Sequence, residues 1–181
     1  FDQYIKAHIL DPLGLYGGFN VNALDSSRFV TLYEYDSASN KLTADPEAYN
    51  PRTEQISNYV MGYSTPVFSP AGGMKISATD LAKYMTMHMY KGRYHGTRII
   101  SKKSAVTMQT PVSHDYGLAI ETTNKLIPGV TMKGHTGSAY GLFSMMFFQP
   151  RKKFGIVAIT NGCNIISYPD FNPALKAVVN I

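Results

Sequence analysis

The sequence has 181 residues, of which 44% are hydrophobic, with 17 Lys and Arg against 12 Asp and Glu, a formal net charge of +5 and one cysteine. This composition excludes a disordered or collagen-like chain and indicates one compact domain that needs neither disulfides nor a structural metal to form its core. The basic residues are scattered, which argues against a nucleic-acid partner, and no apolar run reaches the length of about 18 residues that a membrane span requires.

Apolar residues at helical spacing predict a helix from Phe1 to about Asp11, where Pro12 should end it. Because this helix begins at the first residue, which is not methionine, we expect that an upstream segment has been removed. Residues 29–35 and 41–43 are rich in β-branched and aromatic types around a turn and predict a small hairpin. The Pro- and Gly-rich residues 44–73 predict a long ordered loop of the kind that often lines a site.

The clearest helix signal comes next. Ser77 and Asp80 have the spacing of a capping box, and apolar residues then recur at helical spacing until about Gly92. A shorter helix is predicted over 101–109. Strands are predicted over 116–122, 131–136, 142–149 and 154–161. The last two should be antiparallel neighbours, because the Pro-Arg-Lys-Lys connection between them is too short for a crossover.

The end of the sequence predicts a closing helix. Asn172 before Pro173 is typical of an N-cap followed by proline at the first helical position, and the expected buried face carries Leu175, Val178 and Val179. The predicted order is therefore helices, an antiparallel sheet and one helix packed back on that sheet, which is a mixed α/β (α+β) fold.

One stretch has the residue types of a binding site. His135 and Thr136 stand at the end of a predicted strand, and Gly137 would let a ligand approach the backbone. Side-chain donors next to an exposed N–H suit an anion or an oxyanion. An ordinary strand that runs into a glycine turn accounts for these residues equally simply.

A wider pattern adds to this stretch. Gly62-Tyr63, Pro70-Ala71-Gly72-Gly73 before the capped helix, and His135-Thr136-Gly137 together resemble the C-terminal half of the penicillin-recognising serine hydrolases. These are the class C type β-lactamases and their D-alanyl-D-alanine peptidase and esterase relatives. Residues 1–15, with their Asp-Pro-Leu-Gly-Leu ending, are also similar to the segment after the family's second motif. The resemblance implies that residues 1–181 are the C-terminal part of a single domain with a partial β-lactamase/transpeptidase-like fold.

The family's chemistry uses Ser-x-x-Lys for the nucleophile, Ser-x-Asn or Tyr-x-Asn for proton transfer, and Lys-Thr-Gly or a His version on a strand. Only the third motif is present, because no Ser has Lys three residues on and neither triplet occurs. The resemblance thus implies a fragment of a serine hydrolase whose nucleophile lies in a missing N-terminal portion, so that the chain alone is inactive. The alternative is a non-catalytic relative that keeps the cleft as a binding or sensing module.

The resemblance also implies roles. His135 and Thr136 would face an amide or ester substrate, and the N–H of Ser138 would be one of two oxyanion donors. Imidazole is mostly neutral at pH 7, whereas the lysine of many relatives is charged. We therefore expect a preference for esters, amides or D-amino-acid peptides over β-lactams. Three residues are expected to shape the substrate pocket: Gly137, Tyr140 and Tyr63.

No cofactor and no metal are expected, since His95 and His114 lack partners at metal-ligand spacing. His8 and His88 fall on apolar helical faces and are expected to be core or surface residues. The expected partners are a small-molecule or peptide substrate, and either a second copy of the chain or the missing segment to cover the exposed sheet. By resemblance alone, the protein would act outside the cytoplasm, in the periplasm or anchored to a membrane through the missing N-terminus.

Overall fold

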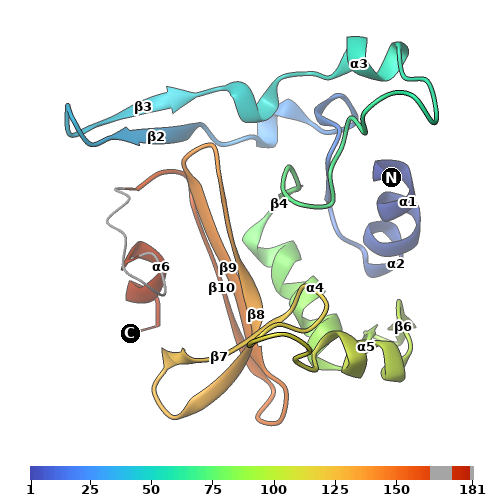
Figure 1. The fold of residues 1–181 in the computed structure, drawn as a ribbon, viewed down its shortest axis with the longest axis vertical. Coiled ribbons are helices and arrows are strands. Elements are labelled where there is room, and N and C mark those ends of the chain that lie inside the picture. The colour runs from blue at the N-terminus through green and yellow to red at the C-terminus, as the bar shows by residue number, and fades with distance from the viewer. Residues whose placement is uncertain (164–172, 180–181) are drawn as a thin grey trace.

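The structure, a computed structural model, describes residues 1–163 and 173–179. A four-stranded antiparallel sheet, in the order β10-β9-β8-β7, stands between helix α4 on one side and helix α6 on the other (Figure 1). The α-helices are α1 (Asp2–Ile5), α2 (Asp11–Leu13), α3 (Thr53–Ser57), α4 (Ala78–Met89), α5 (Lys102–Met108) and α6 (Pro173–Ala177). In the described part of the chain, no helix is both long and apolar enough to span a membrane.

The sheet is formed by β7 (Glu121–Ile127), β8 (Val130–Ala139), β9 (Leu142–Gln149) and β10 (Phe154–Thr160). Three two-stranded pairs accompany it, and they are β1 (Gly17–Gly18) with β4 (Lys75–Ile76), β2 (Leu32–Asp36) with β3 (Lys41–Asp45), and β5 (Arg93–Tyr94) with β6 (Thr97–Arg98). A π-helix covers Lys6–Leu10, and 3₁₀ helices cover Val21–Ala23, Ser26–Arg28 and Glu47–Tyr49.

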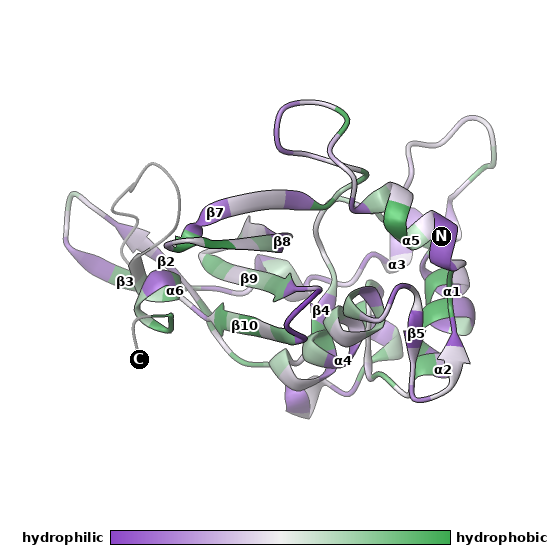
Figure 2. Ribbon diagram, turned by 90° about the horizontal axis from the view of Figure 1, so that it is seen from below, coloured by the Kyte–Doolittle hydropathy of each residue, from purple (hydrophilic) through white to green (hydrophobic). Residues whose placement is uncertain are grey.

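Alternation along β9 divides the core between the two faces of the sheet. Met145 and Phe147 pack with Leu175 of α6 on one face, whereas Met146 and Phe148 pack with methionines of α4 on the other. Figure 2 accordingly shows β9 and β10 mostly in the hydrophobic colour, with α4 and α6 on opposite sides. Both faces of β9 are therefore buried, which explains its nearly continuous run of apolar residues.

The predicted bounds of β9, β10, α4 and α5 are confirmed to within a few residues. Ser77 caps α4 by accepting a hydrogen bond from the N–H of Asp80, and Ser101 caps α5 in the same way. The basic turn joins β9 to β10 as expected. Lys153 within this turn donates from Nζ to the carbonyl of Met89, and thereby caps the C-terminal end of α4.

Two strand ends differ from the prediction. The strand predicted over 116–122 begins only at Glu121, because the backbone of residues 117–119 turns to pack on the end of α5. There Leu118 N–H donates to the carbonyl of Met108, and Ala119 has a φ of 57°. The strand predicted over 131–136 continues to Ala139, so that Gly137 lies within β8 and the turn comes later.

The two terminal helices also differ from the prediction. The first helical stretch passes Pro12 and ends at Gly14, which has a φ of 64°. The π-helical turn before Pro12 rearranges the hydrogen bonds there, so a residue without an N–H does not end the helix. In α6, Leu175 is buried as expected, but Val178 is 44% exposed. The expected N-cap Asn172 lies outside the described residues.

His88 is a buried polar residue of α4. Its side chain is 2% exposed, and Nδ1 has no hydrogen-bond partner among the described residues. The ring of Tyr84 packs edge-on against it at 4.8 Å between centroids. Burial lowers the pKa of His88 to about 4, because the low-dielectric surroundings disfavour the imidazolium. His8, by contrast, is exposed.

The low pKa of His88 predicts a pH-dependent stability. Between about pH 6.5 and pH 4 the unfolded chain binds a proton at this residue and the folded chain does not, so the free energy of unfolding should fall by about 3 kcal/mol across that range. Urea denaturation at the two pH values measures the loss. His88→Leu should remove most of it and the matched exposed variant His8→Leu should not. An unchanged pH dependence in His88→Leu would contradict this assignment.

Candidate active site

The end of β8 is the most distinctive feature of the sheet. Residues 135–139 pair with β9 on one side, from His135 opposite Met146 to Ala139 opposite Leu142. On the other side β7 reaches only as far as Gly134, which pairs with Glu121. No strand in the described part of the chain covers 135–139 on that side, so backbone N–H and C=O groups of alternate residues face an open edge.

Gly134 makes the close approach of β8 and β9 possible. A Cβ at this position would overlap the carbonyl oxygen of Met146 and approach the Cα of Phe147 at 2.7 Å. Gly137 has a similar role further along, since a Cβ there would lie 2.7 Å from the Oγ of Ser144. Both glycines therefore leave room for atoms of β9 that lie close to β8. Neither of them forms the turn that the sequence suggested.

The turn itself is formed by Tyr140 and Gly141. Their φ angles are 51° and 73°, and two positive values in a two-residue loop are typical of a type I′ hairpin turn. A side chain at Gly141 would overlap the carbonyl of Tyr33 in β2. Tyr140 is thus held in a conformation that is uncommon for residues with a side chain, at the tip of the hairpin and next to a pocket.

His135 and Thr136 lie on opposite faces of the sheet. His135 shares the α4 face with Met146, and Thr136 shares the α6 face with Met145. The His135 ring is exposed and stands edge-on to Tyr116, with 5.8 Å between centroids. Its Nδ1 lies within hydrogen-bond reach of the Thr136 carbonyl, which can only accept.

Lys133 is a basic side chain of the same strand, but it is already engaged. Its Nζ donates to the carbonyl of Gln109 and, at 3.4 Å, to Oγ1 of Thr122. Burial lowers the pKa of Lys133, because the ammonium is partly removed from water. Lys133 thus joins the loop after α5 to β7 and β8, and His135 is the exposed titratable residue of this strand.

A pocket of about 370 Å³ adjoins the tip of the β8–β9 hairpin. It lies between the segments 47–52 and 67–75, and Ala139 and Tyr140 form one of its walls. Of the residues predicted to shape a substrate pocket, Tyr140 lines it. Tyr63 does not line it and is 92% exposed, so the structure does not bring this residue to the site. Residues 47–52 and 67–73 of the expected loop do line a pocket.

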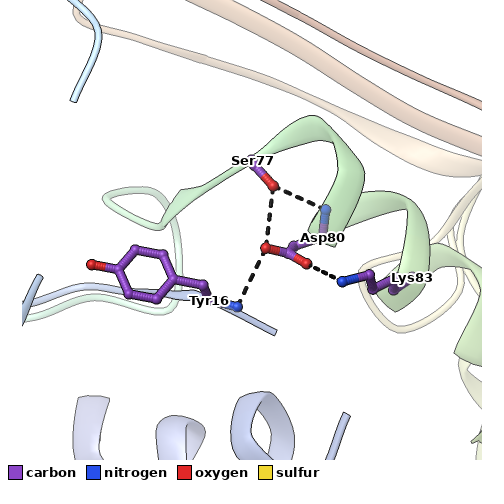
Figure 3. A network of polar contacts seen from close by, with 4 residues as sticks. All are labelled: Tyr16, Ser77, Asp80 and Lys83. Atoms are coloured by element: carbon purple, nitrogen blue, oxygen red, sulfur yellow. Dashed lines mark hydrogen bonds and ion pairs between the residues drawn. The ribbon is translucent and has the colours of Figure 1, made fainter. Parts of the chain in front are cut away.

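A polar network centred on Asp80 lies at the start of α4 (Figure 3). Asp80 accepts hydrogen bonds from the backbone N–H of Tyr16 at 3.3 Å, from Oγ of Ser77 at 3.2 Å and from Nζ of Lys83 at 2.6 Å. Burial alone would raise the pKa of Asp80, but these bonds outweigh it and hold the pKa below its ordinary value. The network joins the start of α4 to the segment leading into β1, which pairs with β4 directly after the 70–73 segment.

Removing the charge of Asp80 should loosen this junction. We expect Asp80→Asn to lower the free energy of unfolding by about 1 to 2 kcal/mol, a modest value because Lys83 is partly solvated. Since the folded pKa lies below the unfolded value of about 3.9, this contribution is present above pH 4 and is lost as the pH falls through the folded pKa. Denaturation at pH 7 and at lower pH measures both effects. The exposed variant Asp115→Asn is the control, and equal stabilities would contradict the expectation.

The pocket is also lined by two basic residues that the sequence did not suggest. Lys75 and Arg52 line it together, although Arg52 precedes α3 and Lys75 begins β4. No motif surrounds either residue in the sequence. The path of the chain between them brings both to the same pocket. Lys75 lies two residues after Gly73, between the Pro70-Ala71-Gly72-Gly73 stretch and the capped helix, but this position alone does not single it out.

Comparisons with known proteins bear on the family and the fold of the chain. A protein-family model described as Beta-lactamase matches residues 1–179. Among solved structures, the chain is similar to the D-stereospecific amidohydrolase from Streptomyces sp., with a TM-score of 0.61, 19% sequence identity, and coverage of 89% of this chain and 44% of the other. At this identity the likeness shows the fold, and the expected mixed fold is confirmed. The chain spans less than half of the amidohydrolase. No protein of the curated set matches.

Proposed function

Because this chain belongs to the Beta-lactamase family, we propose that it forms the C-terminal part of a serine hydrolase that cleaves an amide or ester through an acyl-enzyme. The observation that carries the proposal is the open backbone edge of β8 at residues 135–139, next to a pocket at the hairpin tip. Exposed N–H groups on a rigid strand suit the stabilisation of a negatively charged oxygen, since they need no rearrangement when the charge develops.

In the proposed reaction, a serine hydroxyl attacks the substrate carbonyl and its proton passes to a neighbouring base. The carbonyl oxygen becomes negatively charged and accepts hydrogen bonds from the N–H of Ser138 and from the N–H of the nucleophile itself. The leaving amine or alcohol takes up a proton, and water then hydrolyses the acyl-enzyme. The proton for the leaving group would come back from the base that took it from the serine, and the exposed ring of His135 would face the substrate from β8.

The nucleophile is proposed to come from a segment outside these residues. Two observations support this: no Ser-x-x-Lys occurs in the 181 residues, and the chain spans 44% of the amidohydrolase that it resembles in fold. We propose that the same segment adds a strand to the outer edge of β10, which ends the order of the described sheet and is apolar along Phe154–Thr160.

The proposed substrates are D-configured amides and esters. The amidohydrolase of similar fold is described as D-stereospecific, which supports an amide bond next to a D-centre. The exposed imidazole of His135 stands where many relatives carry a lysine, so a carboxylate beside the scissile bond, as in a penicillin, would be bound less strongly. Esters and amides should therefore be hydrolysed with higher kcat/KM than penicillins at neutral pH.

A labelling experiment tests the proposal. The 181-residue chain is incubated with a fluorescent penicillin and with an activated ester. In parallel, a longer product, the protein expressed with the in-frame upstream coding sequence included, is treated in the same way. We expect no covalent label on the 181-residue chain, and labelling of the longer product at the serine of a Ser-x-x-Lys motif. An upstream sequence without that motif, together with no turnover, would favour the non-catalytic binding or sensing module instead.

A further inference from the structure

The pocket at the hairpin tip combines an apolar floor with a charged rim. Among its lining residues, Phe19 and Ala48 are buried and Phe68 is half-buried, and we call these the floor; Lys75 is half-buried and Arg52 is exposed, and we call these the rim. Its volume of about 370 Å³ falls in the range of small-molecule sites. An apolar floor below cations favours a ligand that has an apolar body and an anionic group.

Neither cation forms an ion pair with another described residue. Within residues 1–163 and 173–179, the ion pairs involve Asp2, Asp11 and Asp80, and none reaches Lys75 or Arg52. The half-buried Lys75 donates from Nζ to the carbonyl of Gly73 at 3.0 Å. An ammonium has three donors, so two of them remain for a ligand.

The charges around the pocket leave a net excess of one positive charge. In the described part of the chain, Glu47 is the single acidic residue that lines it, against Lys75 and Arg52. Burial, and then the nearby positive charge of Arg52, lower the pKa of Lys75. Both causes reflect an unfavourable environment for a cation, and an anion placed between the two side chains would relieve it.

We propose that this pocket binds an organic carboxylate, with its apolar part against Phe19 and Phe68 and its carboxylate between Lys75 and Arg52. Because Ala139 and Tyr140 form a wall of the same pocket and follow Ser138 in the chain, the pocket would hold a substrate group several bonds from the scissile carbonyl. In this respect the inference rests on the proposed function. The substrate would then be a D-configured amide or ester with a distant carboxylate.

Two lining glycines, Gly72 and Gly73, precede Lys75 in the chain. Gly72 and Gly73 have φ angles of 92° and 77°, which residues with side chains rarely adopt. A Cβ at Gly73 would point toward the ring of Phe19, at 3.9 Å. The left-handed backbone at these two glycines therefore sets the path of the segment that leads to Lys75.

The test compares a carboxylate with its neutral isostere. Titration of the 181-residue chain with 3-phenylpropionate and 3-phenylpropionamide, followed by NMR at the amides of residues 71–73 and 139, gives both dissociation constants. The carboxylate should bind at least about 10-fold more tightly than the amide, as charge-assisted hydrogen bonds predict. Arg52→Gln and Lys75→Met should each reduce this ratio to about threefold or less, and Glu47→Gln should raise carboxylate affinity about two- to threefold.

Matched variants distinguish the effect of a lost charge from the effect of poor folding. Lys75→Arg keeps the charge and should keep most of the discrimination, and the exposed Lys102→Met should bind both probes as the parent does. Arg52 is exposed, so Arg52→Gln tests the proposal even if Lys75→Met is poorly folded. Equal affinities for the two probes, no saturable binding, or a ratio that Arg52→Gln leaves unchanged would overturn the proposal. None of these readouts needs acyl transfer, so they are independent of the labelling result.

Discussion

Replacing Ser138 with proline should lower kcat about 10²- to 10³-fold in the form of the protein that carries the nucleophile, which is the usual effect of losing one oxyanion donor. Proline has no N–H, and residue 138 lies in the part of β8 that extends beyond β7. Stopped-flow measurement of acylation by an activated ester detects the loss, and KM should change much less, because the charged oxygen exists only after attack.

The matched variant is Ser138→Ala, which keeps the N–H and removes only an exposed hydroxyl. Its kcat should stay within about twofold of the parent, as expected for a side chain outside the chemistry. Urea denaturation of both variants is also needed. If proline lowers stability strongly, the N–H of Ser138 is bonded to β9 instead of facing the open edge, and the assignment of this donor is contradicted.

Replacing Gly134 with alanine should lower the free energy of unfolding by about 2 to 3 kcal/mol. The new Cβ would overlap the carbonyl oxygen of Met146, and backbone atoms on both strands would have to separate. Because the open segment of β8 starts at the next residue, the displacement should also move the proposed site. Urea denaturation measures the loss of stability. Ester hydrolysis by the longer protein, which carries the upstream segment, measures the displacement of the site.

Gly18→Ala is the control for this substitution. Gly18 also lies in a strand, but a Cβ there would meet only Leu24 at 3.6 Å, an ordinary contact distance. Its stability should therefore change little. A Gly134→Ala variant as stable as Gly18→Ala would show that β8 and β9 can separate at no cost, and that the close approach is not needed.

Local signals explain which elements were predictable. The helix caps at Ser77 and Ser101 and the apolar runs of β9 and β10 are short-range patterns, and their bounds are confirmed. The ends of β7 and β8 were not predictable, because they depend on contacts between strands. Gly137 in particular has the composition of a turn, yet it fits a strand because Ser144 lies opposite.

Some residues of the candidate site were likewise predictable from local sequence, and others were not. The stretch around His135 was predictable from its residue types, and the structure places it on β8 with its ring exposed. His135 and Thr136 face opposite sides of the sheet because β8 continues through both residues. The sequence had predicted a turn directly after them instead. The convergence of Lys75 and Arg52 on one pocket arises from the path of the intervening loop, and no spacing in the sequence encodes it.

The central claim is that the open edge of β8 binds the substrate carbonyl. A crystal structure of the longer product, acylated by a slowly hydrolysed D-amino-acid ester, tests it most directly. The claim predicts the acyl carbonyl oxygen at about 2.7 to 3.1 Å from the backbone nitrogen of Ser138, with the rest of the acyl group toward Tyr140. An acyl group bound elsewhere, or a strand of the longer chain that pairs along residues 135–139, would contradict it.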